Sequence, residues 1–123
     1  MANLVETDKL VTFSKQIDGD ISGPVILINK FTIDPDDVNK FLKAWANDAE
    51  YFKRQPGFIS AQLHRGIGGS GVFVNYAVWE SNAQLKKALN NIDLNALLKA
   101  YPPTTDVSPH LFKKVAVPGI CAD

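Results

Sequence analysis

Two residues of one predicted strand carry side chains that can stabilise negative charge on a bound ligand. Asn75 and Trp79 lie four positions apart in residues 72–79, a short run of β-branched and aromatic residues that predicts a strand. Because side chains alternate along a strand, both point to the same face, which we expect helices to cover. An amide and an indole N–H donate hydrogen bonds, so the pair suits a pocket in which an oxyanion develops. These two residues are therefore candidates for lining a binding pocket.

A second amide and a histidine complete the predicted polar set. Asn29 lies on the inner face of the strand predicted for residues 25–31, where a buried amide needs hydrogen-bond partners. His64 belongs to the strand predicted for residues 58–65, and its imidazole titrates near neutral pH, as a general base requires. Each residue has a structural alternative, because the amides could bond to nearby backbone and a strand histidine is commonly structural. The residues alone leave both interpretations open.

Aromatic side chains could line a cavity beside these polar groups. Trp45 belongs to the apolar face of the first predicted helix, and Phe73 shares a strand face with Asn75. Such flat apolar surfaces suit an aromatic ligand, although core packing explains them equally well. We expect a substrate pocket between helices and sheet, bordered by Trp45, Phe73 and three further phenylalanines: Phe41, Phe52 and Phe58.

The composition excludes several other kinds of site. The 123 residues contain 13 basic and 13 acidic side chains, so no net charge attracts nucleic acid or an anionic membrane. Two histidines and one cysteine cannot form a four-ligand zinc site or a disulfide framework within one chain, so a metal site would need carboxylates. Residues 66–71 match the letters of a dinucleotide-binding loop, but they precede a strand where that loop must open a helix. They predict a hairpin turn.

The chain has the length of one domain. We assign residues 23–118 to it, residues 1–22 to an N-terminal arm or extra strand, and residues 119–123 to a tail. Residues 1–8 include two acids and no apolar signal region, and the longest apolar run is far shorter than the ~20 residues of a membrane helix. We therefore expect a cytoplasmic protein without a membrane span.

The order of predicted elements defines the fold class. Caps, apolar periodicity and Pro-Gly breaks divide the domain into strand 25–31, helix 34–55, strand 58–65, strand 72–79, helix 80–100 with a break at Asn90–Asn91, and strand 111–117. Residues 10–17 alternate weakly, which leaves room for an extra strand. The βαββαβ order predicts an α+β, ferredoxin-like fold with an antiparallel sheet.

The sheet face away from the helices carries an apolar row. Val72, Val74, Tyr76 and Val78 all point there, because they alternate with Asn75 and Trp79. A four-stranded sheet does not leave such a row in water cheaply. We therefore expect a homodimer in which a second copy packs against this face.

Two sequence motifs resemble the antibiotic biosynthesis monooxygenase family. They are residues 55–64, QPGFISAQLH, and residues 73–81, FVNYAVWES. The resemblance covers residues 24–100 and implies a dimeric α+β barrel. It also implies the activity of the family's cofactor-independent members, which oxidise a phenolic ring of a polycyclic aromatic to a quinone with O₂, without flavin, haem or metal.

The resemblance also assigns roles to individual residues. Asn75 and Trp79 match an asparagine and a tryptophan of the family's active site, and His64 matches its strand histidine. Lys99 stands where the active site has an arginine, keeping the charge without the planar fork. Leu85 stands where a catalytic tyrosine is expected, so a proton-transfer group is missing. The sequence places none of the three tyrosines in the pocket: Tyr51, Tyr76 and Tyr101.

Together these observations predict a cofactor-free monooxygenase that oxidises a small phenolic or quinol-type aromatic with O₂. Catalysis is assigned to Asn75, Trp79 and His64, and substrate binding to Asn29, Trp45, Phe73 and Lys99. One alternative is a non-catalytic dimeric binding protein of the same fold, which the Leu85 departure favours. Another is a haem-degrading relative, where Asn29 has a counterpart, but residues 82–100 lack the histidine and tryptophan that haem would need.

Overall fold

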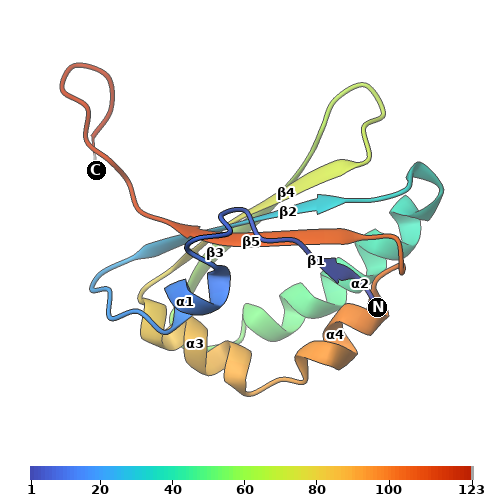
Figure 1. Ribbon diagram of the computed structural model, residues 1–123, viewed down its shortest axis with the longest axis horizontal. Coiled ribbons are helices and arrows are strands. Elements are labelled where there is room, and N and C mark those ends of the chain that lie inside the picture. The colour runs from blue at the N-terminus through green and yellow to red at the C-terminus, as the bar shows by residue number, and fades with distance from the viewer. Residues whose placement is uncertain (123) are drawn as a thin grey trace.

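The computed structural model describes residues 1–122 and has the predicted ferredoxin-like α+β fold, extended by one short strand (Figure 1). The sheet has the strand order β1-β5-β2-β4-β3, in which only the β1–β5 pairing is parallel. The elements in chain order are β1 (Asn3–Leu4), α1 (Phe13–Ile17), β2 (Val25–Thr32), a 3₁₀ turn (Pro35–Asp37), α2 (Val38–Phe52), β3 (Phe58–Arg65), β4 (Val72–Trp79), α3 (Asn82–Asn90), α4 (Leu94–Ala100) and β5 (Asp106–Phe112).

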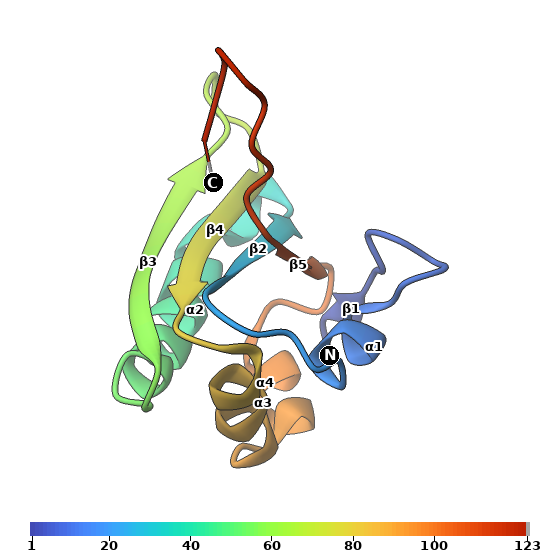
Figure 2. The ribbon, with the colours of Figure 1, turned by 90° about the vertical axis from the view of Figure 1, so that its left-hand side faces the viewer.

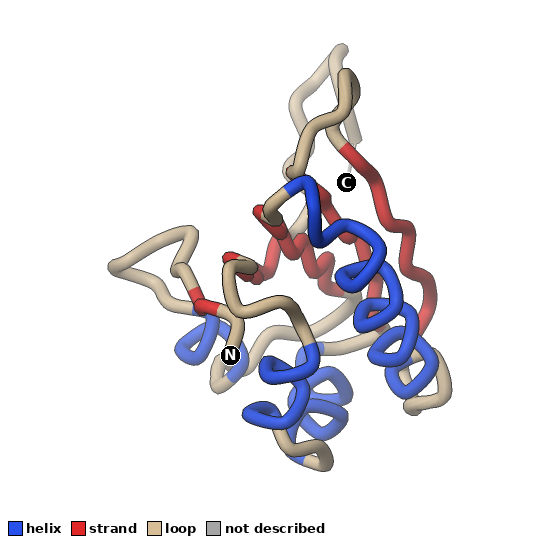
Figure 3. The backbone as a smooth tube through the Cα atoms, turned by 90° about the vertical axis from the view of Figure 1, so that its right-hand side faces the viewer, coloured by secondary structure: helices blue, strands red, loops and turns tan. Residues whose placement is uncertain are grey.

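Helices and sheet form two layers. Helices α2, α3 and α4 lie on one side of the sheet, while the β3–β4 loop and the C-terminal segment project on the other side (Figures 1 and 2). The loop between β1 and α1 stands out from the body, as the tube in Figure 3 also shows. Between the layers lie two hydrophobic clusters, one around Phe41 and one around Trp79. Among the described residues, no helix is long and apolar enough to cross a membrane.

Side-chain caps set where the helices begin. Asp34 accepts a hydrogen bond from the backbone of Asp36 at the 3₁₀ turn that leads into α2. Ser81 caps α3 in the same way. The break predicted within residues 80–100 follows Asn90, and Asp93 then caps α4 as a separate helix. The segment predicted as one helix therefore forms two helices, α3 and α4, and both pack against the sheet.

The final strand differs from its prediction. Strand β5 runs from Asp106 to Phe112, five residues earlier at each end than residues 111–117. The strand includes Pro109, which lacks the backbone N–H that a sheet ladder needs. On β5, however, the backbone of Val107 and of Leu111 bonds outward, to residues of the N-terminal segment. Pro109 alternates with these two residues, so its backbone nitrogen also points away from β2. The missing N–H therefore removes no hydrogen bond between β2 and β5.

Residues 10–17 contain helix α1 and not a strand. The Gln16 side chain of this helix donates to the carbonyl of Leu111 and accepts from its N–H, as a neighbouring strand would. Asn82 donates to three carbonyls at the end of α1, those of Gln16, Ile17 and Gly19. Helix α1 thus covers an edge of β5 that would otherwise present unpaired backbone groups.

The glycine-rich residues 66–71 join β3 to β4 as a hairpin loop, with no helix after them. Gly68 and Gly69 have φ values of 76°, a conformation that side chains with a Cβ adopt only with strain. The interpretation of this run as a turn agrees with the structure, and the dinucleotide-loop geometry is absent from it.

Candidate active site

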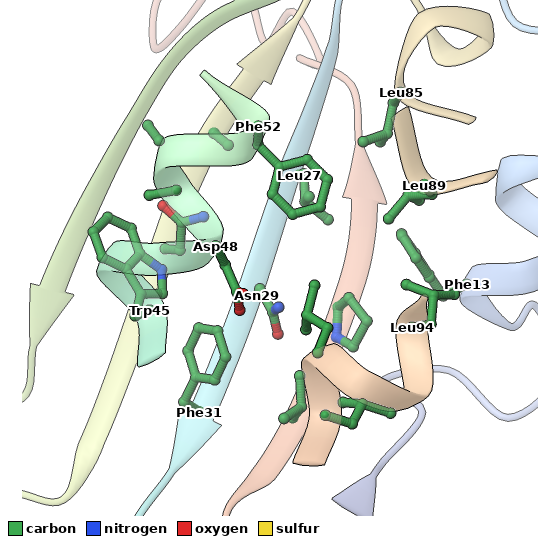
Figure 4. A pocket seen from close by; sticks show the side chains of 18 of the residues that line it. Phe13, Leu27, Asn29, Phe31, Trp45, Asp48, Phe52, Leu85, Leu89 and Leu94 are labelled. Atoms are coloured by element: carbon green, nitrogen blue, oxygen red, sulfur yellow. The ribbon is translucent and has the colours of Figure 1, made fainter. Parts of the chain in front are cut away.

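A cavity of about 220 Å³ lies between the helices and the inner face of the sheet (Figure 4). Its walls come from strands β2, β3, β4 and β5 and from helices α2, α3 and α4, with Leu4 of β1 and Phe13 of α1 also lining it. The walls are mostly aliphatic and aromatic. The polar side chains that reach the cavity are few: Asn29, Asp48, Asn75, Tyr101 and the two tryptophans Trp45 and Trp79.

Asn29 and Asn75 form a matched pair in this cavity. They lie directly opposite each other in the antiparallel pairing of β2 with β4. Both side chains line the cavity, and the side-chain oxygen of each is buried without a hydrogen-bond partner. A buried polar atom without a partner costs ~1–3 kcal/mol. Two such atoms on neighbouring strands therefore favour a ligand that offers them hydrogen-bond donors.

The two tryptophans border the same space. Trp79 is 2% exposed and packs edge-to-face against Phe58, with ring centroids 5.6 Å apart. Its indole N–H has no hydrogen-bond partner among the described residues. Trp45 enters from α2, and in Figure 4 its indole nitrogen faces the side of the cavity where Asp48 and Asn29 lie. The cavity thus combines aromatic surfaces with indole donors.

Asp48 is a site residue that sequence reasoning missed. A charged residue of a helix is expected on the solvent side, yet Asp48 lines the cavity, and in Figure 4 its carboxylate points toward Asn29. The Tyr101 hydroxyl donates a 2.5 Å hydrogen bond to Asp48 Oδ2. The sequence contained a signal for this position. Asp48 is seven residues after Phe41 and three after Trp45, which places it on the apolar face of the helix.

Burial dominates the acid–base properties of this pair. It raises the pKa of Asp48 from the ordinary 3.8 to about 6, and the hydrogen bond from Tyr101 opposes part of that rise. Burial also raises the pKa of the Tyr101 hydroxyl, and the neighbouring Asp48 carboxylate raises it further. At neutral pH the cavity therefore contains one carboxylate, which is poorly solvated and close to its titration range.

The raised pKa of Asp48 predicts a pH-dependent stability. The folded-state pKa exceeds the ordinary value, so the stabilisation it brings is complete below about pH 4 and is lost as the pH rises through about 6. Because Asp48 is partly solvated, we expect a loss of ~1–2 kcal/mol in the free energy of unfolding. Asp48→Asn keeps an acceptor for Tyr101 and should recover this amount at neutral pH, with little change at about pH 4. Urea unfolding at both pH values measures it.

The control for this prediction is Glu50→Gln. Glu50 is an exposed acid of the same helix and pairs with Lys53 on the surface. Its loss should change the free energy of unfolding by well under 1 kcal/mol at either pH. An Asp48→Asn protein that is no more stable than its parent at neutral pH would contradict the assignment of the buried charge.

Four residues expected at the site or its borders do not reach the cavity: His64, Lys99, Phe73 and Phe41. His64 is exposed and lies opposite Val74 on the helix-free face, where its Nδ1 is 3.3 Å from the Val74 carbonyl. Lys99 is exposed, because α4 turns its leucines toward the cavity. Phe73 and Phe41 are both buried in the core, with their ring centroids 4.9 Å apart. A general base at His64 would have to act on the opposite side of the sheet from the asparagine pair.

One of the three tyrosines lies in the cavity, although position 85, where the family has a tyrosine, is a leucine. Leu85 is 1% exposed and contributes an apolar wall to the cavity. Tyr51 donates its hydroxyl to the Ala88 carbonyl, and Tyr76 lies on the helix-free face. Tyr101 is the tyrosine that lines the cavity. A phenol is thus present in the pocket, but it comes from the residue after α4 and not from α3.

The fold matches that of known proteins. The profile of the family described as antibiotic biosynthesis monooxygenase matches residues 24–99. The chain therefore belongs to the antibiotic biosynthesis monooxygenase family. The matched region includes β2, α2, β3, β4 and α3, and with them Asn29, Asp48, Asn75 and Trp79.

Individual relatives support the assignment. Over 72 residues, 58% of this chain, it is 33% identical to deoxynogalonate monooxygenase of Streptomyces nogalater, of which the alignment covers 60%. The structure of SnoaB, a cofactor-independent oxygenase of the same organism, matches with a TM-score of 0.65 and 26% identity, covering 80% of this chain and 99% of SnoaB. A candidate monooxygenase of Shewanella loihica PV-4 matches with a TM-score of 0.67 and 27% identity, covering 80% and 100% of the two chains.

Proposed function

We propose that this protein is a monooxygenase that oxidises a phenolic or quinol-type aromatic with O₂ and without a cofactor. The observation that carries the proposal is the pair of unpartnered amide oxygens of Asn29 and Asn75 inside an apolar, aromatic-walled cavity. A hydroxyl-bearing aromatic ring satisfies both features, because its hydroxyls donate to the amides while its ring lies against the tryptophans. The similarity to deoxynogalonate monooxygenase and to the cofactor-independent oxygenase SnoaB supports the same reaction class.

The size of the cavity suits a small fused-ring substrate. An apolar cavity of about 150 Å³ accommodates benzene, and this one has about 220 Å³. A phenol bound in such a pocket is shielded from water. The NH₂ groups of Asn29 and Asn75 and the indole N–H of Trp79 can then donate hydrogen bonds to negative charge that develops on its oxygen. An electron-rich phenol can itself reduce O₂ once it is deprotonated, so the protein need supply no redox group. Asn75 and Trp79 are the proposed catalytic residues, and Asn29 and Trp45 the proposed binding residues.

Oxygen consumption tests the proposal. Purified protein treated with a chelator is incubated with naphthalene-1,5-diol, and O₂ uptake and the visible spectrum are followed. We expect one O₂ consumed per diol, with formation of the hydroxynaphthoquinone and water, at a rate proportional to protein concentration. Uptake no faster than with heat-denatured protein, for this diol and for a panel of two- and three-ring phenols, would reject the oxygenase. Tight binding without uptake would favour the non-catalytic binding protein instead.

We further propose that the protein functions as a homodimer through its helix-free sheet face. Apolar side chains of β2 and β4 lie on this face, including Ile26, Ile28, Val74, Tyr76 and Val78. The C-terminal segment projects on the same side (Figure 2), with Ile120 83% exposed. A second copy related by a twofold axis would cover the apolar row and the segment together. This arrangement leaves the cavity on the outside of the dimer, under the helices.

A further inference from the structure

We propose that Asp48, held by Tyr101, is the group that takes up and returns protons during the oxidation. The proposal deepens the oxygenase function described above and rests on it for the catalytic step. It gives the cavity the proton-transfer residue that neither His64 nor position 85 supplies. Asp48 touches the substrate space directly, whereas Tyr101 acts through Asp48 and is a positioning residue.

Asp48 is distinctive among the residues that line the cavity. Among the described residues that line the cavity, it is the only carboxylate, and Tyr101 is the only other titratable side chain. One oxygen, Oδ2, accepts from Tyr101, and among the described residues no side chain or backbone donor occupies the other oxygen. In Figure 4 the carboxylate points toward Asn29, the same residue whose amide oxygen lacks a partner. A substrate hydroxyl that accepts a hydrogen bond from the Asn29 amide NH₂ therefore lies beside a free carboxylate oxygen, to which it can donate its own hydrogen.

The surroundings of Asp48 are otherwise uncharged. Helix α2 contributes Trp45 and Phe52 beside it, β2 contributes Asn29, and α4 contributes leucines. The neighbouring cations, Lys43 on α2 and Lys99 on α4, are exposed and do not line the cavity. No opposite charge within the cavity walls therefore holds Asp48 permanently ionised, and the carboxyl can change protonation state as the reaction requires.

The tyrosine bond fixes where this carboxyl points. Tyr101 is 4% exposed and packs in an aromatic cluster, with its ring 5.8 Å from that of Phe31 and 5.6 Å from that of Phe41. A hydroxyl on so rigid a ring constrains Asp48 Oδ2 and thereby directs the other oxygen. The hydrogen bond also stabilises the ionised carboxylate. Tyr101 thus orients the base and keeps its pKa from rising further.

The proton and electron balance is complete with O₂ as the oxidant. Asp48 accepts the hydroxyl proton as the ring transfers one electron to O₂, giving a phenoxyl radical and superoxide. These two combine by forming a C–O bond at the ring carbon para to the phenoxyl oxygen, and Asp48 returns its proton to the outer oxygen. Loss of the hydrogen on that carbon as a proton, with cleavage of the O–O bond, leaves the quinone. The departing hydroxide takes up a proton to become water.

The test compares parent protein, Asp48→Asn and Tyr101→Phe in two assays. In the first, kcat for naphthalene-1,5-diol is measured by O₂ uptake from about pH 5 to 8. We expect the parent kcat to rise with an apparent pKa of about 6. Asp48→Asn should lose that rise and ~10²–10⁴ of kcat, the range of general acid–base catalysis. Tyr101→Phe should shift the rise to higher pH, because the hydrogen bond that lowers the Asp48 pKa is gone.

The second assay separates this proposal from the oxygenase function. Binding of naphthalene-1,5-diol without O₂ is followed by tryptophan fluorescence, since Trp45 and Trp79 border the cavity. The affinity of the parent should increase across about pH 6 as Asp48 becomes an acceptor, while that of Asp48→Asn stays flat. An inactive parent that shows this difference would refute the oxygenase but retain Asp48 as the hydroxyl acceptor. Unchanged kcat and an unchanged pH profile in a folded Asp48→Asn protein would overturn the proposal.

Discussion

Asn75→Ala is expected to lower kcat for oxidation of an aromatic diol by ~10²–10³ while the protein stays folded. That range is the cost of removing one preorganised donor to a developing oxyanion. Asn75 is half-buried, its amide oxygen has no partner, and it lines the cavity opposite Asn29. Removing the amide therefore breaks no hydrogen bond that holds β4 in place. The loss should appear in kcat from O₂ uptake, with the thermal unfolding midpoint within a few degrees of the parent.

The matched control is Asn39→Ala, at an exposed asparagine of α2 that does not line the cavity. It should leave kcat unchanged. Trp79→Phe, which keeps an aromatic ring in the core but removes the indole donor, should lower kcat further when combined with Asn75→Ala. Full activity in the folded double variant would show that neither donor acts on the reacting oxygen.

The inner face of β4 shows what strand periodicity can predict. Residues 58–65 and 72–79 are bounded by Pro-Gly and by a glycine-rich loop, and the structure has strands with these limits. Once β4 was identified, the alternation of side chains placed Asn75 and Trp79 on one face. Asn29 followed in the same way from β2. The position of these residues could be predicted because the alternation of side chains along a strand depends only on the local sequence.

His64 shows where that argument ends. Whether His64 shares a face with Asn75 depends on the register between two strands, and the hairpin loop sets that register. In the structure Leu63 pairs with Asn75, so His64 pairs with Val74 and faces the other side. The sequence gives the composition of the loop but not its geometry. A one-residue difference in register would have reversed the outcome.

Asp48 and Tyr101 illustrate a different limit. The helical spacing of Asp48 from Phe41 and Trp45 places it on the apolar stripe, but its charge argued for solvent. The burial of Asp48 makes sense only with Tyr101 as its partner, 53 positions further along the chain. A contact at that separation depends on how α4 ends and packs under α2, which is a tertiary property. Polar residues on an otherwise apolar stripe are therefore the ones to test as site candidates.

Tyr76→Lys is expected to weaken the proposed homodimer by at least about 10³-fold. Tyr76 lies in the middle of the helix-free face, opposite Ile28 of β2 and Gln62 of β3, and is 39% exposed in the single chain. Buried tyrosines of interface centres commonly contribute more than ~2 kcal/mol, and a twofold axis counts each substitution twice. Lysine adds the cost of desolvating a charge. Since ~1.4 kcal/mol is tenfold in Kd, the stated loss follows.

Leu42→Lys is the matched control for this prediction. Leu42 is also 39% exposed, but it lies on α2, on the helix side of the molecule, where the proposed interface does not reach. Sedimentation equilibrium across a wide concentration range should give a dimer for the parent and for Leu42→Lys, and a monomer for Tyr76→Lys. Because the cavity lies under the helices, the monomer should still bind naphthalene-1,5-diol. A parent that remains monomeric at every concentration would contradict the dimer, and a Tyr76→Lys dimer would move the interface elsewhere.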